Sequence, residues 1–272
     1  MSDGIVTSPD GTRIAYTAWG DGDPIVIIDG ATAYRATTPE NASTAELLAD
    51  EHLVIAYDRR GRGESGDTLP YTVEREYEDL RAVIEQAGNG RPVTVFGWSS
   101  GGNLALNAAQ AGVPIERIAL FEPNAAIDTE TRPPLPTDYV ERIDAAVAEG
   151  RPGDAVALFL TDAALTPAEY VDGMRGQDWW PGLETIAQTI AYDGRQIGDA
   201  LSGKPLSSDL WNRVDVPVLV LHGEDTWPAL AAGARAIAEH LPTAVLKPVP
   251  GQEHSTTPEV LAEALRAFAG EH

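Results

Sequence analysis

The pentapeptide Gly97-Trp98-Ser99-Ser100-Gly101 has the residue types and spacing of an activated serine. It directly follows the apolar run at 93–96 and precedes a helix-forming stretch at 103–111. A nucleophilic serine sits on a sharp, strained turn between a strand and a helix, so that its hydroxyl projects from the sheet edge. Glycines two residues to either side let the two backbones close together. The sequence therefore predicts that Ser99 is a nucleophile.

A serine nucleophile needs a base, and His254 is the best placed of the five histidines. It lies in a turn after the last apolar strand and just before the last predicted helix. That is where the ligand crevice of a parallel sheet opens. We therefore predict His254 as the general base, ahead of the histidines that precede a strand, end a strand, lie in a helix or stand at the C-terminus, which are His52, His222, His240 and His272.

Two carboxylates could orient the imidazole, and the sequence leaves the choice open. Asp225 follows the penultimate strand. The chain order Ser99, Asp225, His254 is nucleophile, acid and base, which is the order expected when the nucleophile lies on a turn of this kind between strand and helix. Glu122 ends the strand that follows the serine's helix and could reach the imidazole from the neighbouring strand. Chain order makes Asp225 the first choice and Glu122 the alternative.

Acyl transfer at a serine also needs two preset N–H donors for the oxyanion. The backbone N–H of Ser100 is one candidate, because it stands at the positive end of the helix dipole. The loop Asp29-Gly30-Ala31 follows the apolar strand at 25–28. We predict that the N–H of Ala31 is the second donor.

The elements that must position these residues follow from the apolar pattern. Strands apolar on both faces alternate with helices, which predicts a parallel sheet covered on both sides. The predicted strands are 24–28, 53–57, 93–96, 115–121, 216–221 and 244–249, and the predicted helices between them include 73–87, 229–241 and 258–268. Asp10-Gly11 predicts an N-terminal hairpin. Only helical stretches stand between the predicted strands at 115–121 and 216–221, so we expect a helical cap at 124–210 inserted into an α/β core of residues 1–123 and 211–272.

These motifs together resemble the α/β-hydrolase superfamily over nearly the whole chain, and most closely its actinobacterial-type α/β-fold hydrolases with a helical cap. The motifs that carry the resemblance are Asp29-Gly30, the segment from Asp58 to Ser65, Gly97 to Gly101, Leu221 to Asp225, and Gly251 to His254. The resemblance implies an α/β-hydrolase fold, with a mostly parallel sheet, helices on both faces and an inserted helical cap.

Two positions depart from that pattern. The family usually has His-Gly where this chain has Asp29-Gly30, and an ionised carboxylate there would oppose the charge of an oxyanion. We therefore expect Asp29 to point away, to be protonated, or to pair with a nearby arginine, namely Arg35, Arg59 or Arg60. The family's acid commonly stands three residues after the glycine, where this chain has Thr226, so Asp225 is one residue early.

The residue type of the nucleophile narrows the class of reaction. Dehalogenases and epoxide hydrolases of this fold use an aspartate where this chain has Ser99, and a serine points instead to acyl-enzyme chemistry. We predict a serine hydrolase for a small or medium apolar ester or lactone. The alternatives are a non-hydrolytic enzyme on the same scaffold (lyase, cyclase, acyltransferase or perhydrolase) and a ligand-binding protein that keeps the serine, the histidine and the acid. The expected substrate pocket, between sheet edge and cap, is lined by Asp29, Gly30, Tyr34, Trp98, Met174, Trp179 and Trp180.

Composition excludes several other classes of function. The 272 residues carry a formal charge of −23, which disfavours nucleic acids and anionic membranes as partners. The absence of cysteine excludes a thiol nucleophile and thiolate metal ligands. No metal or nucleotide motif is present, so we expect no cofactor, no metal and a small-molecule substrate. Without a signal-peptide pattern or a long apolar run, the expected compartment is the cytoplasm. The sequence leaves the oligomeric state open.

Overall fold

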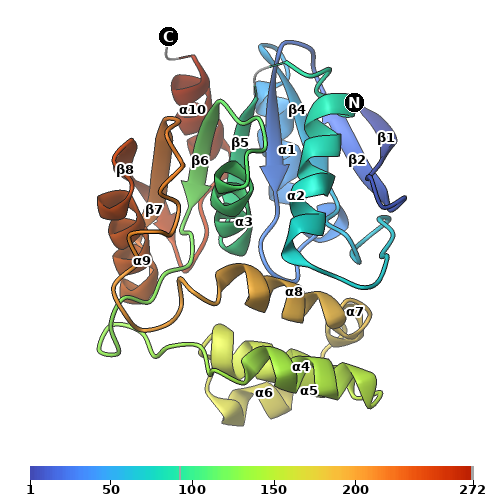
Figure 1. The fold of residues 1–272 in the computed structure, drawn as a ribbon, viewed down its shortest axis with the longest axis vertical. Coiled ribbons are helices and arrows are strands. Elements are labelled where there is room, and N and C mark those ends of the chain that lie inside the picture. Colours follow the sequence, from blue (N-terminus) through green and yellow to red (C-terminus); the bar gives the residue numbers. More distant parts are fainter. Residues whose placement is uncertain (92, 271–272) are drawn as a thin grey trace.

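The computed structural model describes residues 1–91 and 93–270, and these form an eight-stranded sheet flanked by helices (Figure 1). The strand order is β1-β2-β4-β3-β5-β6-β7-β8, and only the pairs β1–β2 and β2–β4 are antiparallel. The strands are β1 (Ser2–Thr7), β2 (Arg13–Trp19), β3 (Asp23–Ile28), β4 (His52–Tyr57), β5 (Thr94–Trp98), β6 (Arg117–Phe121), β7 (Val218–Asp225) and β8 (Ala244–Gln252). The predicted hairpin and the predicted mostly parallel sheet are confirmed.

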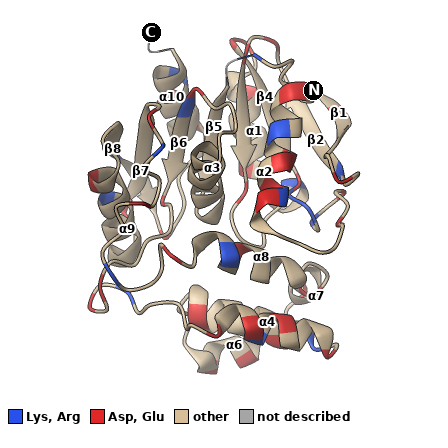
Figure 2. Cartoon of the chain, in the orientation of Figure 1, with Lys and Arg blue, Asp and Glu red and all other residues tan. Residues whose placement is uncertain are grey.

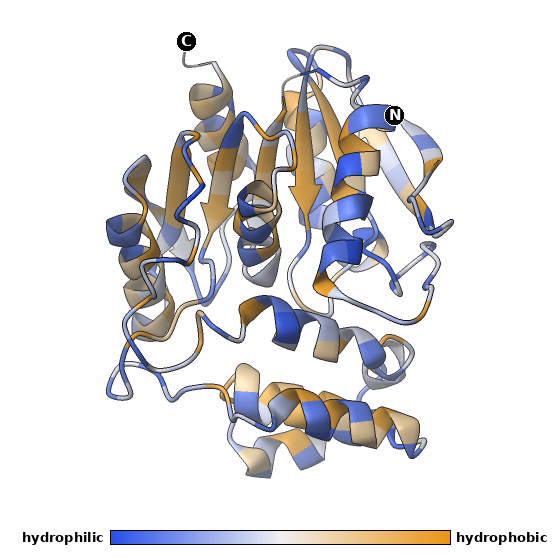
Figure 3. Ribbon diagram, in the orientation of Figure 1, coloured by the Kyte–Doolittle hydropathy of each residue, from blue (hydrophilic) through white to orange (hydrophobic). Residues whose placement is uncertain are grey.

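Helices cover both faces of this sheet. The faces are buried because the central strands are apolar throughout, as in β4, where all six residues are buried, and Figure 3 shows these strands as the most hydrophobic elements. Helices α1 (Pro39–Leu48) and α10 (Pro258–Ala269) pack on one face. Helices α2 (Val73–Ala82), α3 (Ser100–Gln110) and α9 (Pro228–His240) pack on the other. Short helical turns extend this framework: the 3₁₀ turn η1 (Arg35–Thr37) and the π-helical turn η2 (Val83–Ala87).

A group of helices stands between β6 and β7 and forms a layer of its own below the strand ends (Figure 1). Its members are α4 (Tyr139–Ala148), α5 (Pro152–Leu158), the π-helical turn η3 (Phe159–Ala163), α6 (Ala168–Met174), α7 (Trp180–Glu184) and α8 (Gln188–Ile197). We call residues 139–197 the helical segment. It has its own apolar cluster, which includes Tyr139, Ile143 and Ile190. Because the arrowheads of the parallel strands point toward this layer, it lies at the carboxyl edge of the sheet, within the range predicted for a cap.

The turn from β5 to α3 depends on two glycines. A β-carbon at Gly97 would lie 2.5 Å from the carbonyl oxygen of Gly101, so strand and helix could not close. A β-carbon at Gly101 would lie 2.5 Å from the carbonyl oxygen of Ile28 in β3. Both separations are far shorter than real contacts of this kind, so the backbone would have to shift.

Replacing Gly101 by alanine should therefore lower the free energy of unfolding by about 2 kcal/mol or more, because the new methyl group meets backbone atoms of β3. Urea denaturation of the purified variant measures this. Gly173→Ala in α6 is the matched control, since a β-carbon there meets nothing within 4 Å. That control should be neutral or slightly stabilising, because alanine favours a helix more than glycine does. Equal stability of the two variants would contradict the prediction.

Candidate active site

Ser99 stands at the tip of this turn in a conformation that serine rarely adopts. Its φ is 49° and its ψ is −121°, and its N–H donates to the carbonyl oxygen of Phe121 in β6 at 2.9 Å. A positive φ at a non-glycine residue costs free energy and is concentrated at functional sites. The hydroxyl of Ser99 accepts a hydrogen bond from Nδ2 of Asn124 at 3.1 Å. The structure thus places Ser99 on a sharp turn between a strand and a helix, where the sequence predicts it.

Asn124 is held firmly in this position by Asn103, a fully buried residue of α3. The N–H of Asn124 donates to Oδ1 of Asn103 at 2.9 Å, and Nδ2 of Asn103 donates to the carbonyl oxygen of Asn124 at 2.9 Å. Sequence reasoning missed Asn124, since an asparagine after a proline reads as an ordinary turn residue.

His254 faces Glu122 from the loop after β8. Its Nδ1 lies 2.5 Å from Oε2 of Glu122, and the imidazole is 30% exposed while the carboxylate is fully buried. The other carboxylate oxygen, Oε1, accepts from the N–H of Gly223 at 2.9 Å. Burial alone would raise the pKa of Glu122, but the hydrogen bonds from His254 and Gly223 outweigh it and hold that pKa below its usual value. Glu122 is therefore an ionised acceptor that fixes Nδ1 and leaves Nε2 as the ring nitrogen that can take a proton.

Asp225, the first choice from chain order, does not take this place. It lies at the end of β7, opposite Gln252 of β8, and its side chain is exposed. The physical reason is that β7 continues as paired strand through residue 225, whereas β6 ends at Phe121 and Glu122 turns inward with a φ of 47°. The alternative acid, Glu122, is the one that the structure brings to the imidazole.

Ser99 and His254 follow β5 and β8 at the same edge of the sheet. Between these two described side chains the structure has no hydrogen bond, and the Ser99 hydroxyl is engaged by Asn124. Glu122 connects them, since the residue before it accepts from the Ser99 N–H and its own carboxylate contacts the imidazole. Catalytic hydrogen bonds are often long or unformed before substrate binds.

The remaining histidines have other surroundings. Nδ1 of His222 lies 2.9 Å from the carbonyl oxygen of Gly223, and Nε2 of His240 lies 2.7 Å from that of Leu210. His52 is buried at the start of β4. His272 lies outside the described residues.

The two predicted oxyanion donors border Ser99. A β-carbon at Gly30 would lie 3.2 Å from Cβ of Ser99, so the loop after β3 passes directly beside the nucleophile. Among the described residues, the N–H of Ala31 has no hydrogen-bond acceptor. Ser100 is the first residue of α3, where a backbone N–H has no acceptor within the helix. Both N–H groups are therefore available to a ligand.

Asp29 is buried and points toward α1 rather than toward an arginine. Its carboxylate accepts from Nδ2 of Asn41 at 2.6 Å and from the hydroxyl of Thr38 at 3.2 Å. Of the three alternatives expected for Asp29, the structure does not have the pairing with an arginine, because Arg59 contacts only the backbone carbonyl oxygen of Asp29, at 3.4 Å. Burial raises the pKa of Asp29 to about 7.

This raised pKa predicts a pH-dependent stability. Between its ordinary pKa of 3.8 and about 7, the folded protein keeps a proton on Asp29 that the unfolded chain has released. The contribution of Asp29 to the free energy of unfolding should therefore fall as the pH rises through this window, by up to about 1.4 kcal/mol per pH unit. Asp29→Asn should lose this contribution, because the amide can still bond to Asn41 and Thr38. Urea denaturation of both proteins from pH 4 to 8 measures the difference, and parallel curves would contradict the prediction.

The residues expected to line a substrate pocket lie in several different environments. Trp98 donates from Nε1 to Oδ1 of Asn41 at 2.8 Å, and Tyr34 is half-buried beside η1. Trp180 is buried in the apolar cluster of the helical segment, with Met174 packed against that cluster. Packing within the helical segment therefore explains the burial of Trp180 and the position of Met174 without any contact to a substrate. Trp179 is exposed, and its ring lies 5.8 Å from that of Trp180. Their place in a substrate pocket stays a prediction.

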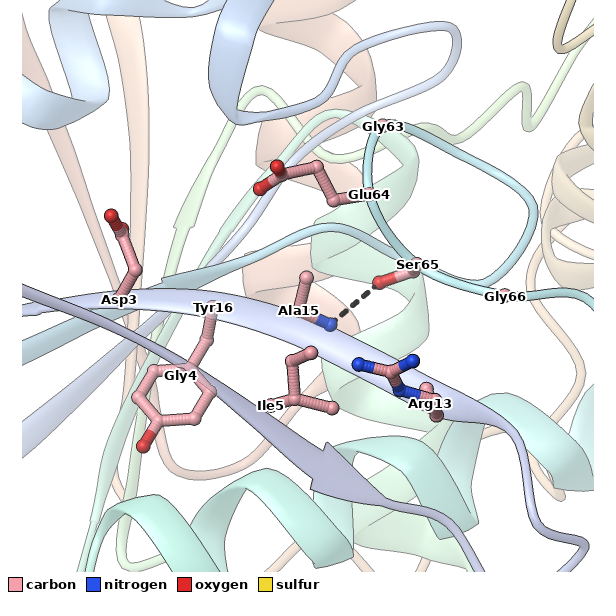
Figure 4. A pocket seen from close by; sticks show the side chains of 10 residues that line it. All are labelled: Asp3, Gly4, Ile5, Arg13, Ala15, Tyr16, Gly63, Glu64, Ser65 and Gly66. Carbon is pink, nitrogen blue, oxygen red and sulfur yellow. Dashed lines mark hydrogen bonds between the residues drawn. The ribbon is translucent and has the colours of Figure 1, made fainter.

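A separate hollow of about 580 Å³ lies between β1, β2 and the loop 63–66, with Arg13, Tyr16 and Glu64 among its lining residues (Figure 4). It contains none of the predicted catalytic residues.

Across residues 1–91 and 93–270, no group of histidine and carboxylate side chains is arranged to hold a metal ion. In the same residues, no helix is long and apolar enough to cross a membrane. Acidic residues occur on elements throughout the fold rather than on one segment (Figure 2).

Comparison with known proteins agrees with this fold. The model of the alpha/beta hydrolase family matches residues 25–264. A non-heme chloroperoxidase from Streptomyces lividans is 31% identical over 97% of this chain and 99% of its own length. A bifunctional esterase/perhydrolase from Acinetobacter calcoaceticus is 27% identical over 97% and 99%. The crystal structure of an alpha/beta hydrolase from Sphaerobacter thermophilus is 42% identical, covers 98% of this chain and 100% of its own, and superposes with a TM-score of 0.85. The chain belongs to the alpha/beta hydrolase family.

Proposed function

We propose that this protein is a serine hydrolase that cleaves a small or medium apolar ester or lactone through an acyl-enzyme on Ser99. The observation that carries the proposal is the strained Ser99 beside a buried, ionised Glu122 that holds the imidazole of His254. These are the three roles that nucleophilic catalysis by serine needs: nucleophile, base and orienting acid.

In the first half of the reaction, Oγ of Ser99 attacks the carbonyl carbon of the ester while Nε2 of His254 takes the hydroxyl proton. The carbonyl oxygen becomes an oxyanion, which the N–H groups of Ala31 and Ser100 stabilise. The C–O bond to the leaving group then breaks, and His254 returns its proton to the departing alkoxide. The products of this step are the alcohol and an ester of Ser99.

In the second half, a water molecule gives a proton to His254 and its oxygen attacks the acyl carbon. The bond to Ser99 Oγ breaks as His254 protonates that oxygen, and the carboxylic acid leaves. Throughout, Glu122 stabilises the imidazolium that forms and keeps Nε2 directed outward. Asn124 donates to Ser99 Oγ in the resting structure, so it can also stabilise negative charge that develops on that oxygen.

A perhydrolase is the second candidate. One similar protein is named an esterase/perhydrolase and another a non-heme chloroperoxidase. Ester hydrolysis and perhydrolysis share the acyl-enzyme and differ only in the acceptor of the acyl group. Water as acceptor gives the carboxylic acid, and hydrogen peroxide in its place gives a peracid. The helical segment covers the strand edge and would influence which acceptor enters.

The experiment is active-site labelling combined with turnover. A fluorophosphonate probe should label the protein once, on the tryptic peptide that contains Ser99, and labelling should stop p-nitrophenyl acetate hydrolysis. Hydrogen peroxide is then added during turnover, and bromide oxidation detects any peracid that forms. Peracid formation would identify the second candidate, the perhydrolase. Labelling at another residue, or the absence of both labelling and turnover, would refute the proposed function.

A further inference from the structure

A cluster of four buried charges lies beside the nucleophile, and the reaction steps described above give it no role. Arg59 and Arg62 come from the loop after β4, Glu76 from α2 and Asp193 from α8. Each of these side chains is 3% exposed or less. Two positive and two negative groups balance, so the cluster can exist away from water only because its members pair.

Asp193 is the centre of this cluster. Its Oδ1 accepts from Nη1 of Arg59 at 2.7 Å and from the hydroxyl of Ser100 at 2.7 Å. Its Oδ2 accepts from Nη2 of Arg62. Burial alone would raise the pKa of Asp193, but the charges of the two arginines and these hydrogen bonds bring it below its usual value. A single ionised carboxylate of the helical segment thus holds the residue that follows the nucleophile.

Arg62 extends the same cluster to the loop on the other side of Ser99. Its Nη1 donates to the carbonyl oxygen of Gly30 at 2.6 Å and to that of Ala33 at 3.3 Å. Its Nε donates to the hydroxyl of Thr189, a second residue of α8, at 3.1 Å. The planar guanidinium therefore has fixed acceptors on several sides, which determines its orientation.

The contact with Gly30 has a direct consequence for Ala31. A trans peptide is planar, so the carbonyl of Gly30 and the N–H of Ala31 point in opposite directions from one rigid unit. With the carbonyl oxygen bound by Arg62, the N–H of Ala31 is turned to the opposite side, and it has no acceptor among the described residues. A rotation of this peptide would remove the donor from its position.

We propose that Arg62 and Asp193 are positioning residues that together fix the two oxyanion donors, the N–H groups of Ala31 and Ser100. This inference rests on the proposed function, since it concerns the oxyanion formed at Ser99. Arg62 orients the Ala31 peptide through the carbonyl of Gly30, and Asp193 anchors both Arg62 and the side chain of Ser100. Helix α8 is thereby coupled to the transition state, although neither charged group contacts the reacting atoms.

Arg62→Lys tests this role. Lysine keeps the positive charge and can pair with Asp193, but its single ammonium group cannot also hold the Gly30 carbonyl in the geometry of the guanidinium. Arg60→Lys is the matched control. Arg60 is equally buried in the same loop, yet its partners are Asp79 and Asp10, at 2.7 and 3.1 Å. Any general cost of exchanging a buried arginine for lysine should appear in both variants.

For p-nitrophenyl acetate, kcat of Arg62→Lys should fall roughly 10- to 100-fold with KM changed less than about threefold, since loss of an oxyanion donor costs about 10² to 10³. Affinity for an aryl trifluoromethyl ketone, whose Ser99 adduct carries an oxyanion, should fall by a similar factor. Arg60→Lys should keep kcat within about threefold of wild type. A purely structural role of Arg62 would lower Tm without this selective loss of kcat and of oxyanion affinity.

Ser100→Ala is the second variant, which removes one hydrogen bond and leaves all four charges in place. It should lower kcat severalfold, because the side chain of Ser100 is then no longer anchored to Asp193. If wild type is active and labelled at Ser99 while Arg62→Lys and Arg60→Lys have equal kcat, this inference is overturned and the proposed function stands. If wild type shows neither turnover nor labelling, both fall. Should Arg62→Lys fail to fold, an unchanged kcat in Ser100→Ala overturns the inference.

Discussion

Replacement of Ser99 by alanine should lower kcat for p-nitrophenyl acetate by about 10⁶-fold and abolish fluorophosphonate labelling, while Tm stays nearly unchanged. The rate effect is large because no other group in the proposed mechanism can form the acyl-enzyme, and loss of a serine nucleophile removes the action of its base at the same time. The stability effect is small because the Ser99 hydroxyl makes one hydrogen bond, with Asn124, at an incompletely buried site. Steady-state kinetics and thermal denaturation measure the two quantities.

Ser43→Ala is the control for this variant. Ser43 is an exposed residue of α1 whose hydroxyl donates to the carbonyl oxygen of Pro39 at 3.2 Å. Its replacement should change neither turnover nor labelling. Turnover in Ser99→Ala within about tenfold of wild type would show that Ser99 is not the nucleophile, and the cofactor-free acyl-enzyme route would have to be abandoned.

The parts of the fold that the sequence predicts are those with a local apolar signal. Strands such as β4, buried along their whole length, stand out as short apolar runs between polar turns. Helix α1 was missed because its inward face includes Asn41 and Thr44, so the sequence lacks an apolar stripe there. The same omission hid the partners of Asp29, since Asn41 and Thr38 belong to this helix and its N-terminal boundary.

The parts of the site that escaped prediction depend on contacts between distant segments. Arg62 and Asp193 are 131 residues apart, and Ser100 and Asp193 are 93 apart. Nothing in the spacing of Asp193 within α8 distinguishes it from a surface acid, and charged residues are usually exposed. By contrast, Ser99 and its flanking glycines act within five residues, and their geometry could be predicted from the pentapeptide alone. Local motifs identify the nucleophile, while tertiary packing selects its partners.

Tertiary packing also decides between Glu122 and Asp225 as the orienting acid, and this choice has a large kinetic consequence. Glu122→Gln should lower kcat by about 10⁴-fold, as loss of the orienting carboxylate does in serine enzymes. The amide of glutamine can donate to Nδ1 of His254, which moves the ring proton to Nε2 and leaves no base for Ser99. Asp225→Asn should keep kcat within about twofold, because that side chain is exposed and does not contact the imidazole.

Both variants conserve shape, so a difference between them reports the charge and the proton position rather than packing. Binding should separate from chemistry in the same measurement: Glu122→Gln should lower kcat with little change in KM, since Glu122 is fully buried and faces His254 instead of the substrate. The reverse pattern, a large loss in Asp225→Asn and a small one in Glu122→Gln, would mean that the end of β7 rearranges on substrate binding to bring Asp225 to the imidazole. The contact between Glu122 and His254 would then belong to the resting enzyme alone.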